Sequence, residues 1–403
     1  MARLGFVTGL LAALLFCAAA GAGQTVLLIS IDGFRADYLD RGLTPTLSAL
    51  AADGVRAAMR PSFPSLTFPN HYTLVTGLYP DHHGITDNSM EDARLGRFAL
   101  SSREAVVDRA WWDGGTPVWV SVERQKGHAA PLFWPGSEAD IQGVPPSFRL
   151  PYDANMPDAD RVARVLSWLD LPEAERPSFL TLYFEKVDTA GHHEGPDSPA
   201  LDQALGEIDA AIAQLTQGLA QRHLADKVDL IIVADHGMTQ LAPERTLFID
   251  DYAAANSLHI VTWGAMMGLA PMPGAERVVE TALLSPKPHM VCRRKQDMPE
   301  RFHYGHNPRI PPILCLAETG WIVTTHDQAA KQTSPYVGTH GFDNQAPDMR
   351  ALFIGHGPDF RQGMAHAPFD NVDVYPLAMK LLGLAPEPND GRLSDVSDML
   401  VTP

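Results

Sequence analysis

Aspartate and histidine residues stand at the ends of several apolar runs, where they could act together on one ion. Taken one at a time, such a residue is most simply a helix cap or a turn residue. Taken together, they are the oxygen and nitrogen ligands that zinc accepts in proteins. Asp188 and His192 are four residues apart, so one helical turn or a compact loop would bring both to the same ion. The full set is Asp32, Asp188, His192, Asp235, His236 and His340.

The hydroxyl of Thr67 is a second chemical candidate, within the stretch 60–72. Three prolines in this stretch fix their own backbone angles and keep the residues before them out of the helical region. Thr67 therefore stands where a helix can begin. A hydroxyl there can cap the helix, or act as a nucleophile beside an anion held by the free N–H groups. The stretch alone favours the cap, whereas the Asp and His set favours the nucleophile.

Apolar runs that alternate with helical patterns indicate the elements that must position these side chains. Runs that are apolar throughout suit strands buried on both faces of a sheet. In open α/β sheets, ligands bind outside the carboxyl ends of the strands, which is where Asp32, Asp188 and Asp235 stand. We therefore expect one doubly wound α/β domain with a mostly parallel sheet and helices on both faces. The expected strands are 25–31, 179–184, 228–234 and 351–354, and the expected helices are 46–52, 198–219 and 372–382.

Residues 253–325 are harder to interpret, because short apolar runs there are mixed with Pro and Gly. We expect this stretch to hold smaller peripheral strands. It also contains Cys292 and Cys315, which apart from Cys17 are the chain's only cysteines. A cysteine-based zinc site is thereby excluded, and at most one disulfide joins the pair. Whether they are bridged stays open, because the sequence does not give their separation.

The charge of the chain excludes one class of partner. The 48 acidic and 31 basic residues give a formal net charge of -17. Such a chain does not suit binding to the phosphate backbone of a nucleic-acid duplex by counterion release. Bound metal ions would reduce the charge, and clustered carboxylates are one reason for having it.

The first residues have the pattern of an export signal. A short positive start at 1–3 is followed by an almost wholly apolar run at 4–20 and by small residues at 20–23. The run is at the short end for crossing a bilayer, so we expect a cleaved signal peptide over 1–23 and no membrane span after its removal. Residues 24–403 would then be one periplasmic or secreted domain.

Seven short motifs occur in order through most of the mature chain: Asp32-Gly33-Phe34-Arg35, Thr67-Phe68-Pro69-Asn70-His71, Trp134-Pro135-Gly136-Ser137-Glu138, Tyr183-Phe184-Glu185-Lys186-Val187-Asp188, Gly191-His192, Ala234-Asp235-His236-Gly237-Met238 and Gly338-Thr339-His340-Gly341. Together they resemble the nucleotide pyrophosphatase/phosphodiesterases of the alkaline phosphatase superfamily. The chain is similar to bacterial members that consist of the catalytic domain alone. The resemblance implies an alkaline-phosphatase-like fold over residues 24–403.

The resemblance also implies two zinc ions and a role for each motif residue. One zinc would be held by Asp188, His192 and His340, and the other by Asp32, Asp235, His236 and the Thr67 oxygen. Thr67 would be the nucleophile, because bound zinc lowers the pKa of its hydroxyl. Asn88 and the backbone N–H after Thr67 would donate to a phosphate oxygen. Phe68 and Tyr183 would hold a nucleotide base between two rings, although the burial tendency of Tyr183 leaves a core position equally open.

The implied reaction is hydrolysis of a phosphodiester or phosphoanhydride in two displacements through a phosphorylated Thr67, releasing nucleoside 5′-monophosphates from nucleotides or dinucleotides. Three alternatives stay open. The same metal set would serve a diesterase for choline-type or lysophospholipid head groups. A phosphomonoesterase would need a cationic group for the extra phosphate charge, and no arginine flanks Thr67. An exported metal-dependent binding protein without turnover is the remaining class. The oligomeric state stays open.

Overall fold

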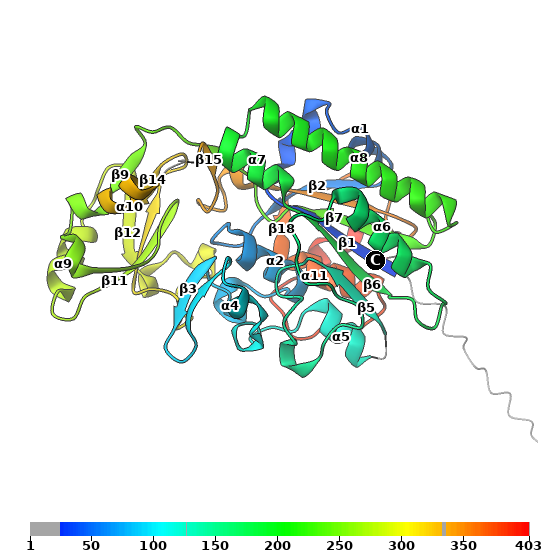
Figure 1. Cartoon of the computed structure of the whole chain (residues 1–403), viewed down its shortest axis with the longest axis horizontal. Coiled ribbons are helices and arrows are strands. Elements are labelled where there is room, and N and C mark those ends of the chain that lie inside the picture. The colour runs from blue at the N-terminus through cyan, green and yellow to red at the C-terminus, as the bar shows by residue number, and fades with distance from the viewer. Residues whose placement is uncertain (1–24, 126, 333–335, 403) are drawn as a thin grey trace, which may run out of the picture.

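A mostly parallel β-sheet forms the centre of the computed structural model, which describes residues 25–125, 127–332 and 336–402 (Figure 1). The predicted signal peptide, residues 1–23, lies outside the described residues. The strands run in the order β17-β2-β16-β7-β1-β6-β5, with β18 also paired to β2. Of these described strands, β16 is antiparallel to both of its neighbours. Their bounds are β1 Thr25–Ile31, β2 Val55–Arg60, β5 Ala129–Leu132, β6 Phe179–Phe184, β7 Val228–Val233, β16 Ala351–His356, β17 Met364–Ala365 and β18 Phe369–Asp370.

The register of the three central strands explains why the predicted ligands meet. In β1, Ile31 is opposite Phe184 of β6, and Ser30 is opposite Val233 of β7. All three strands are parallel and buried along almost their whole length, as the continuous apolar runs predict. Asp32 and the residues that follow β6 and β7 therefore emerge at the same edge of the sheet.

Helices cover both faces of this sheet. The described helices α1 (Pro45–Asp53), α6 (Asp158–Leu169), α7 (Lys186–Glu194) and α8 (Pro199–Gln221) pack together on one face. On the other face lie α2 (Thr67–Thr76), α5 (Val118–Arg124) and α11 (Val374–Leu381) (Figure 1). The shorter α3 (Pro80–His83) and α4 (Arg103–Val107) follow α2 along the chain. No helix within the described ranges is long and apolar enough to cross a membrane.

The predicted elements agree with the observed ones to within a few residues. The strand predicted at 228–234 ends at Val233, and the helix predicted at 198–219 runs from Pro199 to Gln221. Ser198 caps that helix, because its side chain accepts a hydrogen bond from the Leu201 N–H. The helix predicted at 372–382 is shorter, since a 3₁₀ turn over Asn371–Asp373 precedes α11.

A second, antiparallel sheet occupies much of the stretch predicted to hold peripheral strands. Its order is β10-β11-β13-β12, and it packs a separate apolar cluster with α9 (Glu276–Leu283). We call the part of the chain from Thr246 to Lys331 the small lobe; Figure 1 shows it apart from the main sheet. Its described elements are β9 Thr246–Phe248, β10 Leu258–Thr262, β11 Met266–Pro271, β12 Met290–Arg294, β13 Ile313–Ala317, β14 Ile322–Thr324 and α10 His326–Lys331. Three two-stranded sheets complete the fold: β14 with β9, β15 (Gly338–Thr339) with β8 (Thr239–Gln240), and β3 (Ser89–Asp92) with β4 (Gly96–Ala99).

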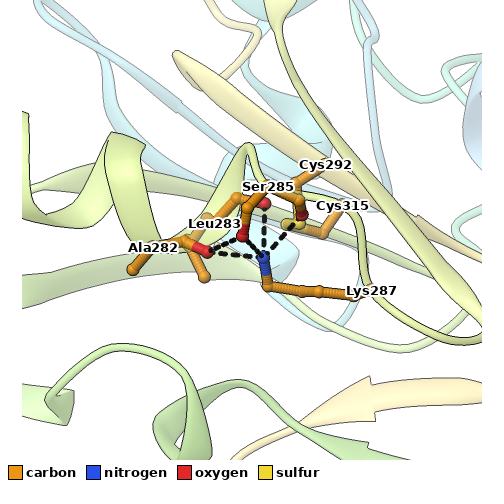
Figure 2. Close-up of a disulfide and its surroundings, with 6 residues drawn as sticks. All are labelled: Ala282, Leu283, Ser285, Lys287, Cys292 and Cys315. Carbon is orange, nitrogen blue, oxygen red and sulfur yellow. Dashed lines mark hydrogen bonds between the residues drawn. A yellow bond between two sulfur atoms is a disulfide. The ribbon is translucent and has the colours of Figure 1, made fainter.

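A disulfide joins Cys292 and Cys315, the pairing that the sequence left open. The two residues are directly opposite each other on the antiparallel strands β12 and β13. Figure 2 shows the bridge beside Lys287, whose amine donates to backbone carbonyls at the end of α9, including that of Leu283. The bridge therefore ties the middle of the small lobe together.

Candidate active site

Thr67 is the first residue of α2, and its hydroxyl faces the cluster of aspartate and histidine residues. Leu66 occupies the cap position in extended conformation, without a side-chain cap. The Thr67 Oγ1 lies 3.2 Å from the Nε2 of His236. Asn70 holds the approach to the helix, because its amide donates to the carbonyls of Pro64 and Leu66. The hydroxyl thus stands at a helix N-terminus without serving as its cap.

One group of three side chains comes from α7 and from the residue after β15. Asp188 and His192 lie one turn apart on α7, and the His192 Nε2 is 3.4 Å from the Asp188 Oδ1. The His340 Nε2 is 3.1 Å from the His192 Nε2 and 3.6 Å from the Asp188 Oδ1. Gly338 permits this approach of β15 to α7, since a Cβ there would lie 2.4 Å from the Gly191 carbonyl oxygen.

A second group follows the central strands β1 and β7. The His236 Nε2 lies 2.9 Å from the Asp235 Oδ2 and 3.6 Å from the Asp32 Oδ1. Gly33 links the two strand ends, because its N–H donates to the Asp235 Oδ1 at 3.1 Å. Its φ of +69° suits glycine, and a Cβ there would press on the backbone of Asp188 at 2.9 Å. Because it has no side chain, Gly33 therefore lets the group of Asp32, Asp235 and His236 lie close to Asp188 of the other group.

The three histidines share one hydrogen-bonding arrangement. The Nδ1 of His192, His236 and His340 faces the backbone carbonyl of Gly338, Gly237 and Ser65, respectively, at 2.8 to 2.9 Å. A carbonyl accepts only, so each Nδ1 carries the proton and each Nε2 presents a lone pair. Lone pairs on His192 and His340 that face each other at 3.1 Å repel unless a cation lies between them. A carbonyl partner on the far nitrogen is the usual support of a metal-binding histidine.

The three carboxylates point to the same conclusion. The Asp32 Oδ1, Asp188 Oδ1 and Asp235 Oδ2 are buried and have no hydrogen-bond partner among the described residues. A buried, unpaired carboxylate oxygen is costly, and a bound cation would satisfy it. Burial, together with the nearby charges of Asp235 and Asp188, raises the pKa of Asp32 well above its usual value. These residues therefore fit divalent metal ions such as zinc, for which carboxylate and imidazole are ordinary ligands.

His71 also lies close enough to be considered, since one of its nitrogens falls within 4.8 Å of carboxylate oxygens of Asp32 and Asp235. If distance alone decided, His71 would join Asp32 and Asp235. His236 would then belong with Asp188 and His340. Hydrogen bonding decides otherwise, because both ring nitrogens of His71 are in use: Nδ1 with the Thr67 carbonyl and Nε2 with the Ser30 hydroxyl, each at 2.8 Å. Burial lowers the pKa of His71, so it is a neutral positioning residue under Thr67.

A cavity of about 1090 Å³ opens over the two groups. Phe68 and Asn88 line it directly beside Thr67. The Asn88 Oδ1 accepts the Phe68 N–H at 2.9 Å, which leaves the Asn88 Nδ2 as the group to donate to a ligand. Phe68 is half-buried, and its ring packs against Phe98 and Trp112. Both predicted substrate-binding residues near Thr67 therefore reach the cavity.

Tyr183, the other predicted ring of the base clamp, is held differently. Its side chain is 8% exposed, and its hydroxyl donates to the Asp32 Oδ2 at 2.6 Å. Its ring meets that of His71 edge to face. This position suits orienting Asp32 and does not suit stacking on a base, which agrees with the core alternative. Tyr152, whose ring centre lies 6.4 Å from that of Tyr183, is 42% exposed and lines the same cavity.

Sequence reasoning missed Tyr152 and His71. Tyr152 lies in an irregular segment between β5 and α6, where no periodic pattern signals a cavity residue. His71 could have been found, because it is four residues after Thr67 on the helix predicted to begin there. Its backbone carbonyl accepts the indole N–H of Trp134 at 3.0 Å, which explains the place of Trp134 in a motif.

Comparison with known proteins agrees with this geometry. The family model described as type I phosphodiesterase/nucleotide pyrophosphatase matches residues 26–343. The chain belongs to this family. A Schizosaccharomyces pombe protein named as an uncharacterized pyrophosphatase/phosphodiesterase is 38% identical over 382 residues. The match covers 91% of the present chain and 79% of the S. pombe protein. Ectonucleotide pyrophosphatase/phosphodiesterase family member 3 of Rattus norvegicus is 37% identical over 94% of this chain, which spans 44% of the rat protein.

Solved structures of the family show the same fold. Murine ectonucleotide pyrophosphatase/phosphodiesterase 5, as an inactive threonine-to-alanine variant in complex with AMP, superposes with a TM-score of 0.89 at 33% identity. The match covers 94% of this phosphodiesterase-family chain and 100% of the murine chain. The alkaline-phosphatase-like α/β fold expected from the sequence is thereby confirmed. The chain is an enzyme of the nucleotide pyrophosphatase/phosphodiesterase class.

Proposed function

We propose that residues 24–403 form a single catalytic domain that binds two zinc ions and releases nucleoside 5′-monophosphates from nucleotides or dinucleotides. The observation that carries the proposal is the position of the Thr67 hydroxyl, at a helix N-terminus and 3.2 Å from His236, beside two groups of Asp and His side chains. In this assignment Asp188, His192 and His340 hold one ion. Asp32, Asp235, His236 and the Thr67 oxygen hold the other.

Zinc at these positions would supply Lewis acidity, lowering the pKa of the Thr67 hydroxyl and neutralising charge on the phosphoryl oxygens. The residues of the chain then position the reaction. The Phe68 N–H, the donor expected after Thr67, is already bonded to the Asn88 Oδ1. The Asn88 Nδ2 would therefore donate to a phosphate oxygen, where a fixed donor stabilises developing negative charge. His71, one turn further along α2, supports the first turn of the helix through a hydrogen bond to the Thr67 carbonyl.

The reaction takes place in two displacements at one phosphorus atom. The Thr67 Oγ1 forms a bond to phosphorus as the bond from phosphorus to the leaving oxygen breaks, and the leaving group departs as an alcohol or phosphate. Water then attacks the same phosphorus and breaks its bond to Thr67, which regains its proton as the nucleoside monophosphate leaves. The name of the murine structure supports this role, since that threonine-to-alanine variant is inactive and holds AMP.

The nucleoside that stays on the phosphoryl group would lie toward Phe68 and Tyr152. Both side chains line the cavity, and Tyr152 replaces Tyr183 as the second ring of the proposed clamp because its side chain is the exposed one. We also infer export, from the signal-like pattern of residues 1–23 and from the ectonucleotide name of the rat relative.

Product analysis tests the proposal. The zinc-loaded wild type is incubated with ATP, a dinucleotide, glycerophosphocholine and a phosphomonoester, and we expect AMP from the first two. Thr67→Ala should abolish turnover with an unchanged melting temperature, whereas Thr67→Ser should retain part of the activity because the oxygen remains. If Thr67 is only the first residue of the helix, Thr67→Ala would instead leave the kinetics nearly unchanged, because its hydroxyl does not cap the helix. Exclusive release of phosphocholine would overturn the nucleotide assignment in favour of the head-group diesterase.

A further inference from the structure

The cavity over the metal-binding groups is lined by two chemically different sets of residues. Near Phe68 the lining includes Arg97, Arg103 and Glu138, which are charged. The lining residues described between 241–266 and 322–337 are all uncharged. Figure 1 shows β9, β14 and α10 at the left of the view, apart from α4 and β5. The cavity therefore extends into a second, uncharged region formed largely by the small lobe, which we call the distal region.

Three aromatic side chains face the distal region. Trp263 is 43% exposed and Tyr336 is 45% exposed, and both line the cavity. Phe248 lines it as well, with its ring stacked on that of His326 at 4.0 Å. Large apolar side chains on a cavity wall favour contact with a flat or apolar group of a ligand.

Trp263 is held in place by its neighbours. It lies in the turn between β10 and β11, where Gly264 exchanges two backbone hydrogen bonds with Val323. The preceding Thr262 donates its hydroxyl to the Asp87 Oδ1 at 3.2 Å, next to Asn88. The turn is thus tied to both the rest of the small lobe and the loop that carries a predicted phosphate donor. An aromatic side chain on a fixed turn has only its own two side-chain torsions to restrict when a ligand stacks on it.

The position of Tyr336 shows that the distal region begins beside the metal-binding groups. Its ring centre lies 4.5 Å from that of His192, a member of the group with Asp188 and His340. Thr67 attacks from the side of His236, and an in-line displacement expels the leaving group on the side opposite the nucleophile. In the proposed assignment, the ion held by Asp188, His192 and His340 would neutralise the leaving oxygen. A departing group would then pass Tyr336, which lies beside His192, on its way into the distal region.

We propose that Trp263, with Phe248 and Tyr336, forms a second aromatic subsite that binds the leaving nucleoside of a dinucleoside polyphosphate. This inference rests on the proposed nucleotide activity and specifies its substrate class. The cavity volume of about 1090 Å³ is at the upper end of the roughly 300–1000 Å³ usual for ligand pockets. The uncharged lining matches a neutral nucleoside, and a pyrophosphate leaving group gains nothing from it.

The test compares diadenosine triphosphate, which leaves an adenosine-bearing group, with ATP, which leaves pyrophosphate. Base stacking on an aromatic ring is worth enough to change binding by about tenfold to a hundredfold. Trp263→Ala should therefore lower the ratio of kcat/KM for diadenosine triphosphate to that for ATP by about tenfold, chiefly through KM. Trp263→Phe should restore part of the ratio, and Tyr336→Ala should lower it as well.

The matched control is Tyr252→Ala, which removes a partly exposed ring of the small lobe that does not line the cavity. This variant should leave the ratio at the wild-type value. An unchanged ratio in both Trp263→Ala and Tyr336→Ala overturns the subsite while the proposed function stands. If these two variants lose only the hydrolysis of lysophosphatidylcholine, the subsite for a nucleoside is overturned and the distal region binds an acyl chain instead. Failure of the wild type to cleave either nucleotide overturns the proposed function and the subsite together.

Discussion

The chemistry of the site depends on which nitrogen of each histidine carries a proton. In His192, His236 and His340 the Nδ1–H donates to a backbone carbonyl, so the Nε2 lone pair stays free for a metal ion. In His71 the Nε2 is also hydrogen-bonded, to the Ser30 hydroxyl. Hydrogen bonding thus divides four neighbouring histidines into three candidate ligands and one positioning residue.

Metal content tests this division. Asp188→Ala and His340→Ala should each lower bound zinc from about two ions to about one per chain, because they remove ligands of the same ion. His71→Gln should keep both ions, although it loosens the support under Thr67. Elemental analysis of dialysed protein gives the ratios, with the exposed His82→Ala as a surface control. Loss of one zinc from the His71 variant would show that the grouping by distance is the correct one.

At the scale of elements, the loop before β3 connects the reaction site to the small lobe. Asp87 precedes Asn88 and is fully buried; its Oδ1 accepts the Ser89 N–H and the Thr262 hydroxyl, whereas its Oδ2 has no partner among the described residues. Burial raises the pKa of Asp87 to about 7. The loop therefore carries a proton on Asp87 near neutral pH that the unfolded chain would release.

The pH dependence of stability tests this assignment. The folded pKa is above the unfolded value of 3.8, so the contribution of Asp87 is fully present below about pH 4 and is lost as the pH rises through about 7. Relative to the wild type, Asp87→Asn should therefore gain stability between pH 5 and pH 8, on the order of 2 kcal/mol. Denaturant unfolding of both proteins at the two pH values measures the difference. The same offset at both values would mean that Asp87 is already ionised in the folded loop.

At the scale of the whole molecule, the two largest of the four apolar clusters among the described residues are packed separately. The cavity lies where their elements meet. The main cluster surrounds the central sheet, whereas the small lobe has its own cluster around β11, β12 and β13. The small lobe is stabilised further by the disulfide between strands that are neighbours in the sheet but 23 residues apart in sequence. Its order matters for function if Trp263 and Phe248 bind part of the substrate.

Removal of the disulfide should destabilise the small lobe. A bridge that closes a loop of 23 residues is worth about 3 kcal/mol, mainly by restricting the unfolded chain. Replacing both Cys292 and Cys315 by Ala should lower the free energy of unfolding by about that amount. Dithiothreitol should bring the wild type to the same midpoint and leave the double variant unchanged. A wild type that is insensitive to the reductant would contradict the stabilising role.

The sequence alone determined the parts of this protein that depend on local pattern. Continuous apolar runs predicted the central strands to within about one residue, because burial on both faces favours apolar residues at most positions of a strand. The prolines before Thr67 predicted the start of α2 at that residue. The positions of Asp32 and Asp235 after strands predicted that their side chains would meet, since parallel strands end at one edge.

Only the tertiary structure decided contacts between distant residues whose local sequence carries no trace of them. The family resemblance groups His340 with His192, 148 residues apart, and the structure places their Nε2 atoms 3.1 Å from each other. The Tyr183 hydroxyl reaches Asp32 across 151 residues, a contact that makes a ring expected to stack on a base a support for a carboxylate. The pairing of Cys292 with Cys315 depended on the register of β12 and β13. Trp263 of the small lobe and Tyr336, which follows that lobe in the sequence, line one cavity although they are far apart along the chain. Such contacts arise from the packing of whole elements, whereas periodicity and turn chemistry report only on near neighbours along the chain.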